Sequence, residues 1–263
     1  MIRKYWKQFT VFMSVLVLSI LMGVGGVSAY MMDRDDSLNT VSIGDVQITA
    51  WEPNFPTEDE DGDTVPDECE LVIPYETIPK DPRIKNIGTN KAIVFFRITA
   101  PMETLSLISD DGVRGAEALQ DLFWFKEAAD SDDKHENNFN DNWIEITQFS
   151  REEVICDAVN DEGNGLTYVF GYHTILDTGE ETSTLFDKVQ NKKYGSRTIG
   201  PEEIEQIRID SFAIQADDIH QAGIEFPTNG ETLTEEQLTY IYSVFINQNQ
   251  EALSVLGKEV DNS

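Results

Sequence analysis

The side chains best suited to chemistry in this sequence are carboxylates, and they crowd into one stretch, residues 52–70. Hard cations such as Ca²⁺ take six to eight oxygen ligands, and one loop can supply them when acidic residues recur at close spacing. Carboxylates stand at positions 1, 3, 5, 9 and 12 of such a loop frame, namely Asp59, Asp61, Asp63, Asp67 and Glu70. The spacing predicts a calcium site, and the alternative is an acidic loop that is only solvated.

The calcium frame departs from the EF-hand at its turn. An EF-hand needs glycine at position 6 of the loop, where this sequence has Thr64, and the nearest glycine, Gly62, stands at position 4. No flanking helices are predicted. The D-x-D-x-D spacing is similar to the looser calcium loops of extracellular repeat proteins, so we expect either a loop of that kind or no bound ion.

No motif in the sequence identifies a catalytic centre. The zinc motif H-E-x-x-H is absent, and the three histidines are far apart: His135, His173 and His220. The nucleophile motif G-x-S-x-G is also absent, and neither cysteine has a histidine nearby in the sequence. Catalytic residues and organic cofactors are therefore not predicted, and Zn²⁺ is expected only if the chain is a metallopeptidase.

The two cysteines, Cys69 and Cys156, leave two interpretations open. Outside the cell they could form a single disulfide, since the extracellular environment is oxidising. Two cysteines do not make a disulfide framework, however, and two separate thiols, one or both buried, are the alternative.

The first 29 residues have the pattern of a secretory signal peptide. Basic residues precede an apolar run at residues 9–22, and small residues then lead to a cleavage site between Ala29 and Tyr30. The apolar run is shorter than the 18 or more residues of a membrane-spanning helix, so an uncleaved anchor is the less favoured interpretation. We expect a secreted protein that contacts the membrane only through the uncleaved signal.

Charge and composition disfavour one class of function, nucleic acid binding, and indicate a folded protein. Removing the three basic residues of the signal leaves 16 basic against 49 acidic residues, a net charge of −33. Nucleic acid binding is disfavoured, because it needs a basic surface to neutralise phosphates. Hydrophobic residues make up 40% of the chain and aromatic residues 10%, which is enough for a packed core.

The clearest predicted strand is residues 92–100, A-I-V-F-F-R-I-T-A, where β-branched and aromatic residues dominate. Its alternation places Val94, Phe96 and Ile98 on one face and Phe95 and Arg97 on the other. We expect the strand to end at Pro101, because proline cannot donate to a ladder. A turn at residues 86–90 precedes it.

Further strands are predicted by alternation or by apolar runs, at residues 41–51, 122–126, 143–147, 154–158, 166–176, 185–189 and 205–216. Residues 143–147 are expected to pair with residues 122–126, and residues 113–120 are compatible with a helix. Gly171 indicates a bulge or a close backbone approach. A capping box at residues 234–237 predicts a helix that packs Leu238 and its helical neighbours on the sheet.

These elements predict an all-β fold with minor helices, a two-sheet sandwich with a C-terminal helix. The expected organisation is a signal at residues 1–29, a flexible segment at 30–40, the sandwich at 41–256 with its acidic loop at 52–70, and a polar tail at 257–263. Phe123 and Trp124 could form a platform for an aromatic or sugar ligand, although core packing is favoured. Residues 190–198 form one of the few basic patches in this acidic chain.

Several segments, in this order, resemble the TasA/camelysin family of secreted Gram-positive bacterial proteins with a SipW-type signal peptide. They are G-G-V-S-A-Y (residues 25–30), N-T-V-S-I-G-D-V-Q-I (39–48), the stretch from K-D-P-R to I-T-A-P (80–101), G-E-E-T-S-T-L-F-D-K-V (179–189) and F-A-I-Q-A-D-D-I (212–219). Two features depart from the family: the acidic loop at residues 58–70 looks inserted, and Tyr-Met-Met follows the signal instead of aromatic-Thr-Asp.

The resemblance implies a jelly-roll-like sandwich and a structural role at the cell surface or in a biofilm matrix. Family members processed by a dedicated signal peptidase assemble into fibres, in which an N-terminal segment of one subunit completes the sheet of the next. In this chain the donor would lie within residues 30–43, where Val41 and Ile43 alternate. The family name also implies a metal-dependent endopeptidase as an alternative, and a calcium-binding surface adhesin is a second alternative.

Overall fold

The computed structural model describes residues 38–42, 46–58, 60, 66, 75–109, 111–127, 135–157, 162–195, 207–216 and 232–248. All of these residues belong to one compact unit that begins at Leu38. The fold is all-β with one long helix near the C-terminus, which confirms the predicted fold class. No helix among the described residues is both long enough and apolar enough to cross a membrane.

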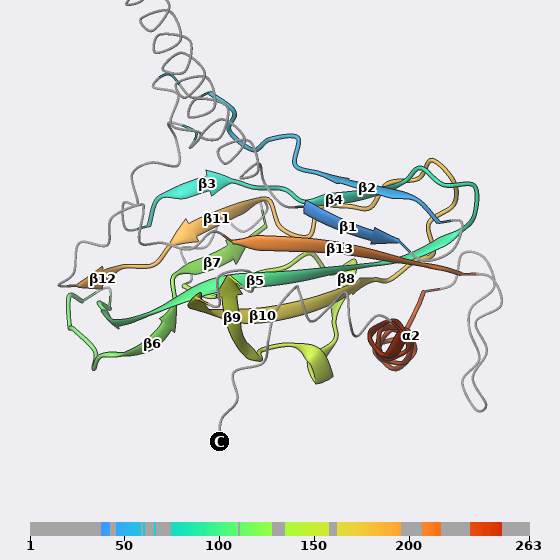
Figure 1. The fold of residues 1–263 in the computed structure, drawn as a ribbon. Helices are drawn as coiled ribbons and strands as arrows, with labels where there is room; N and C mark the ends of the chain where they lie inside the picture. Colours follow the sequence, from blue (N-terminus) through green and yellow to red (C-terminus); the bar gives the residue numbers. More distant parts are fainter. Residues whose placement is uncertain are drawn as a thin grey trace, which may run out of the picture. The chain divides into compact units, whose positions relative to one another are not determined.

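The largest sheet is built around β5 (Ala92–Leu107), the strand that the sequence marks most clearly. Its main path runs β1 (Leu38–Ser42), β13 (Arg208–Gln215), β5, β10 (Glu162–Tyr172) and β8 (Trp143–Glu145) (Figure 1). Three short strands pair off this path: β6 (Ala118–Asp121) and β12 (Tyr194–Gly195) with β5, and β9 (Glu153–Asp157) with β10.

Two smaller sheets cover one face of this large sheet. One contains β3 (Thr77–Pro79), β11 (Lys188–Asn191) and β7 (Phe123–Lys126), and the other pairs β2 (Ile48–Trp51) with β4 (Arg83–Asn86). One core cluster joins the large sheet to the two smaller sheets. It includes Ile48, Ile84 and Phe125 from the smaller sheets and Val94, Phe96 and Ile98 from β5. The arrangement is therefore sandwich-like, with the alternate residues of β5 turned inward as predicted.

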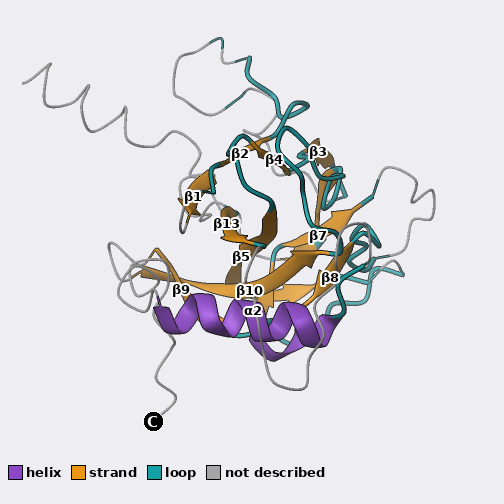
Figure 2. Ribbon diagram, turned by 90° about the vertical axis from the view of Figure 1, so that its right-hand side faces the viewer, coloured by secondary structure: helices purple, strands orange, loops and turns teal. Residues whose placement is uncertain are grey.

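The opposite face of the large sheet is covered by α2 (Glu235–Gln248), as Figure 2 shows. The capping box forms: the Thr234 backbone N–H donates to Gln237 Oε1 at 2.7 Å, and the Gln237 N–H donates to Thr234 Oγ1 at 3.3 Å. A second core cluster fills the space beneath the helix and contains Ile93, Phe95 and Phe212 from the sheet with Leu238, Ile241, Tyr242 and Phe245 from the helix. The predicted apolar face of the helix is confirmed.

The predicted end of the central strand at Pro101 is wrong, because β5 continues to Leu107. Proline is tolerated there because the neighbour of β5 changes at this point. The pairing with β13 ends at Thr99, and the pairing with β6 begins at Met102. On that side no ladder partner stands opposite Pro101, so its missing N–H costs no ladder hydrogen bond.

Three local predictions also need correction. Residues 113–120 do not form a helix, since their C-terminal part belongs to strand β6. The strand that begins at Trp143 pairs with β10, whereas β7 pairs with β11, so the predicted partnership between them is wrong. The single strand expected over residues 41–51 is two strands, β1 and β2, which belong to different sheets. In the last two cases the strands were predicted, but their neighbours depend on contacts between residues distant in sequence.

Candidate functional site

Most residues that the sequence singled out lie outside the described part of the chain. These are Ala29 and Tyr30 at the predicted cleavage site, Ile43, Cys69, His220, and the carboxylates Asp59, Asp61, Asp63, Asp67 and Glu70. Cys156 lies in β9, and Val41 lies in β1. The calcium site, the disulfide and the cleavage site therefore stay predictions.

The strand that contains Val41 occupies one edge of the large sheet. β1 pairs with β13 in parallel, with Leu38 opposite Ile209, Val41 opposite Phe212 and Ser42 opposite Ala213. Every other strand pairing among the described residues is antiparallel. Because β1 precedes β13 by about 170 residues, no local hairpin ties the two strands together.

The neighbour of β1 is a strand with the burial of a sheet interior. The five residues of β13 that face β1, residues 209–213, are at most 3% exposed. Without β1, their outward N–H and C=O groups would form an open edge on a hydrophobic strand, which favours pairing with another chain. The β13 edge (residues 209–213) is therefore a strand-binding site that this chain fills with its own N-terminal strand.

A second candidate site is an aromatic group at the far end of β5. The ring centroid of His135 lies 4.6 Å from that of Tyr75 and 4.6 Å from that of Trp124, with interplanar angles of 4° and 7°. Trp124 lies on β7, where its neighbours Phe123 and Phe125 are buried in the core. The two alternatives predicted for this pair, core packing and an aromatic platform, therefore apply to different residues. Phe123 packs in the core, and Trp124 belongs to the surface stack.

Tyr75 is held in the stack in a conformation that non-glycine residues rarely adopt, with φ of 67°. Its backbone N–H donates to the carbonyl of Asn191 at 2.9 Å, and its own carbonyl accepts a hydrogen bond from Gln190 Nε2 at 3.2 Å. Strained backbone of this kind persists only where the surroundings determine it, and it concentrates at functional sites.

Two consecutive lysines of the predicted basic patch reach the same aromatic group. Lys192 Nζ lies 5.2 Å from the Trp124 ring centroid and pairs with Asp121 Oδ1 at 2.7 Å, and both side chains are largely buried. Lys193 Nζ lies 5.9 Å from the Tyr75 ring centroid and forms no ion pair with a described carboxylate. The Lys192 charge is neutralised by Asp121, whereas no carboxylate among the described residues pairs with Lys193.

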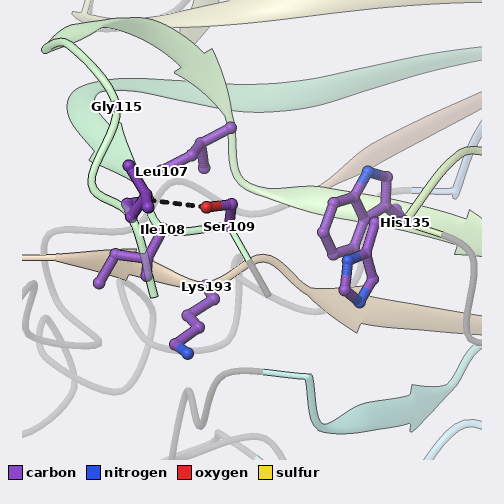
Figure 3. A pocket seen from close by; sticks show the side chains of 8 residues that line it. Leu107, Ile108, Ser109, Gly115, His135 and Lys193 are labelled. Atoms are coloured by element: carbon purple, nitrogen blue, oxygen red, sulfur yellow. Dashed lines mark hydrogen bonds between the residues drawn. The ribbon is translucent and has the colours of Figure 1, made fainter. Parts of the chain in front are cut away.

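Trp124, His135 and Lys193 line a pocket of about 400 Å³, which we call the Trp124 pocket. Its lining includes Leu107, Ile108, Val113, Trp124, His135 and Lys193. In Figure 3, Leu107, Ile108 and Ser109 lie on one side and His135 on the other, with Lys193 below Ile108 and Ser109. The volume lies within the range of small-molecule sites.

The histidines do not gather into a metal site within the described part of the chain. His135 is in the aromatic stack, while Nδ1 of His173 lies 2.7 Å from the backbone carbonyl of Asn142. No group of three His, Cys, Asp or Glu side chains among the described residues is arranged to hold a metal ion. The geometry therefore gives no specific support to the metallopeptidase alternative.

Comparison of the chain with family models, curated proteins and solved structures finds no match.

Sequence reasoning found two parts of the Trp124 pocket and missed the rest. Trp124 and the basic patch were both noticed, but as separate features. Tyr75 and His135 gave no signal, since they lie about 50 and 11 residues from Trp124 in loops without periodicity. Strand β11 places Tyr75 beside β7, because Asn191 lies opposite Phe123 and its carbonyl accepts a hydrogen bond from the Tyr75 N–H. The segment after His135 is held to β7 by the Asn138 N–H, which donates to the Phe125 carbonyl at 2.7 Å.

Proposed function

We propose that this protein is a secreted structural subunit of the cell surface or extracellular matrix, which assembles by exchange of its N-terminal strand. The observation that carries the proposal is the parallel pairing of β1 with the buried edge of β13. The resemblance to the TasA/camelysin family supports the same role and the same segment as donor. A signal peptide supports export, and a dedicated signal peptidase is the expected processing partner.

Strand exchange needs a donor that binds equally well within one chain and between two chains. β1 meets this condition, because its ladder partners among the described residues all come from β13 and none depends on a hairpin turn. In an assembly, β1 of one subunit would occupy the β13 edge of the next, with the same register. Such a head-to-tail contact uses two different surfaces, so it produces open filaments unless it closes into a ring.

Electrostatics sets the conditions for assembly. A net charge of about −33 after export makes subunits repel one another, and salt or divalent cations screen that repulsion. We therefore expect assembly of the mature chain to increase with ionic strength and with Ca²⁺ or at mildly acidic pH.

Cysteine cross-linking between two chains tests strand exchange directly. Thr40 lies opposite Ser211, so a Thr40→Cys chain mixed with a Ser211→Cys chain should form a disulfide-linked dimer, with Cys69→Ser and Cys156→Ser in both. The matched control pairs Thr40→Cys with Gln215→Cys, which lies four residues further along β13 and out of reach of residue 40.

Deleting residues 30–43 should abolish the filaments that we expect the mature chain to form in electron microscopy. Equal cross-linking in the control, or filaments from the deleted chain, would refute strand exchange.

A further inference from the structure

We propose that the Trp124 pocket binds a small aromatic carboxylate, with its ring against the apolar lining and its carboxylate at Lys193. The inference is independent of strand exchange, because the pocket lies beside β7, β12 and the end of β5, and none of its lining residues belongs to β1 or β13. Three properties of the pocket define the ligand class: its lining, its charge and its rigidity.

The lining favours an apolar ring over a polyhydroxylated one. Leu107, Ile108 and Val113 contribute apolar side chains to the lining, and Val113 is 61% exposed. Ser109 is a poor partner for a ligand hydroxyl, because its Oγ already donates to the Val113 carbonyl at 2.9 Å and pairs with the carboxylate of Asp111. A sugar would leave several hydroxyls without partners here, whereas an aromatic ring needs none.

The charge favours an anion that is small and carries one negative charge. Lys193 supplies a cation that no described carboxylate neutralises, and an ammonium next to aromatic rings binds a carboxylate by a charge-assisted hydrogen bond. The protein as a whole is strongly acidic, with a net charge of −30 over the full chain. The acidic protein therefore repels long polyanions such as polyuronates. A monocarboxylate carries a single charge, so the same repulsion lowers its affinity only slightly.

The backbone around the pocket is already held in place. Ile108 N–H donates to the Lys193 carbonyl at 2.8 Å, which fixes Lys193 against the end of β5. On the other side, the Lys192–Asp121 pair lies against Trp124, and hydrogen bonds to β11 hold Tyr75. Because the Lys193 backbone and the Trp124 ring are held by these contacts before a ligand arrives, we expect little conformational entropy to be lost on binding.

The test is titration of the folded protein with phenylacetate at low ionic strength, followed by calorimetry and by ligand-observed NMR. We expect saturable binding of phenylacetate, and binding at least about ten-fold weaker for benzyl alcohol, which lacks the carboxylate. Lys193→Met should weaken phenylacetate binding by about ten-fold. Lys85→Met removes the same charge from β4, away from the pocket, and should leave binding unchanged.

Each other outcome overturns the proposal. Absence of saturable phenylacetate binding, or equal binding by the Lys193→Met and unsubstituted chains, would exclude the site. Tighter binding of glucuronate than of phenylacetate would replace the aromatic class with an acidic sugar. Folding is checked by circular dichroism and thermal unfolding of each variant, and Lys193→Gln provides a second variant that removes the charge but keeps a polar side chain. Strand exchange is expected to be unaffected in all these variants, because Lys193 and Lys85 lie outside β1 and β13.

Discussion

Gly171 of β10 faces Leu238 of α2 so closely that a Cβ atom at position 171 would lie 2.7 Å from Leu238 Cδ2 and 2.9 Å from Cδ1. The first core residue of the helix therefore rests directly on the backbone of the sheet. Gly171 within a strand indicated either a bulge or a close backbone approach, and the close approach is confirmed. Glycine is required here by space and not by backbone conformation.

Substituting Gly171 with alanine should destabilise the protein by overpacking. We expect Gly171→Ala to lower the free energy of unfolding by about 1–3 kcal/mol, since Leu238 is fully buried and cannot move freely. The double variant Gly171→Ala, Leu238→Ala should be less unstable than the sum of the two single variants, as measured by urea unfolding. Gly115→Ala is the control, because its Cβ would meet only the Leu107 carbonyl, at 3.4 Å.

The Lys192–Asp121 ion pair is expected to stabilise the Trp124 pocket. Replacing Asp121 with asparagine leaves the ammonium of Lys192, whose side chain is 8% exposed, without its partner. We expect a loss of about 3 kcal/mol in the free energy of unfolding, measured by chemical denaturation. Glu145→Gln breaks the bond to Arg151, which is 71% exposed, and should cost less than about 1 kcal/mol. Similar losses in the two variants would contradict this prediction.

Two buried tyrosines should make the fold sensitive to alkaline pH. Burial raises the pKa of Tyr242 beneath α2 to about 12, and burial, with a smaller contribution from Asp121, raises the pKa of Tyr168 to about 12. Unfolded tyrosine loses its proton near pH 10. Between pH 10 and 12 the folded chain thus holds protons that the unfolded chain has released, so the free energy of unfolding falls as pH rises.

The contribution of Tyr242 can be isolated by substitution. Tyr242→Phe should reduce the pH slope of the free energy of unfolding between pH 10 and 12, by at most about 1.4 kcal/mol per pH unit. Below pH 9 this group should contribute no slope, so the two chains should show parallel pH dependence there. Urea unfolding at a series of pH values measures both regions. An unchanged slope above pH 10 would show that the Tyr242 hydroxyl ionises without unfolding.

The acidic loop remains a calcium-site prediction that can be tested without structural detail. The double substitution Asp61→Asn, Asp63→Asn removes two of the predicted ligands, and calorimetry should show that saturable Ca²⁺ uptake at millimolar concentration is lost. Asp35→Asn, Asp36→Asn removes the same charge outside the loop and should retain uptake. If the unsubstituted chain itself shows no saturable uptake, the stretch is a solvated acidic loop.

Local pattern identified many of the elements but few of their partners. Alternation placed Val94, Phe96 and Ile98 on one face of β5 and Phe95 on the other, as observed, and the capping box located the start of α2. These features depend on neighbours in sequence, which period and capping chemistry reveal directly. By contrast, the strand at Trp143 was predicted to pair with the wrong neighbour, and β5 was predicted to end at Pro101. Both predictions failed because strand order and edge position are not encoded in a strand's own residues.

The sequence by itself determined a signal-like N-terminus, an acidic chain, a β-rich core and a C-terminal helix, because composition and periodicity follow from side-chain chemistry alone. Tertiary structure decided which strand covers the β13 edge and that Tyr75, His135, Trp124 and two lysines meet at one end of β5. These juxtapositions join segments tens of residues apart or more. Only the packing of the sheets, which buries the apolar faces of all the strands at once, brings them together.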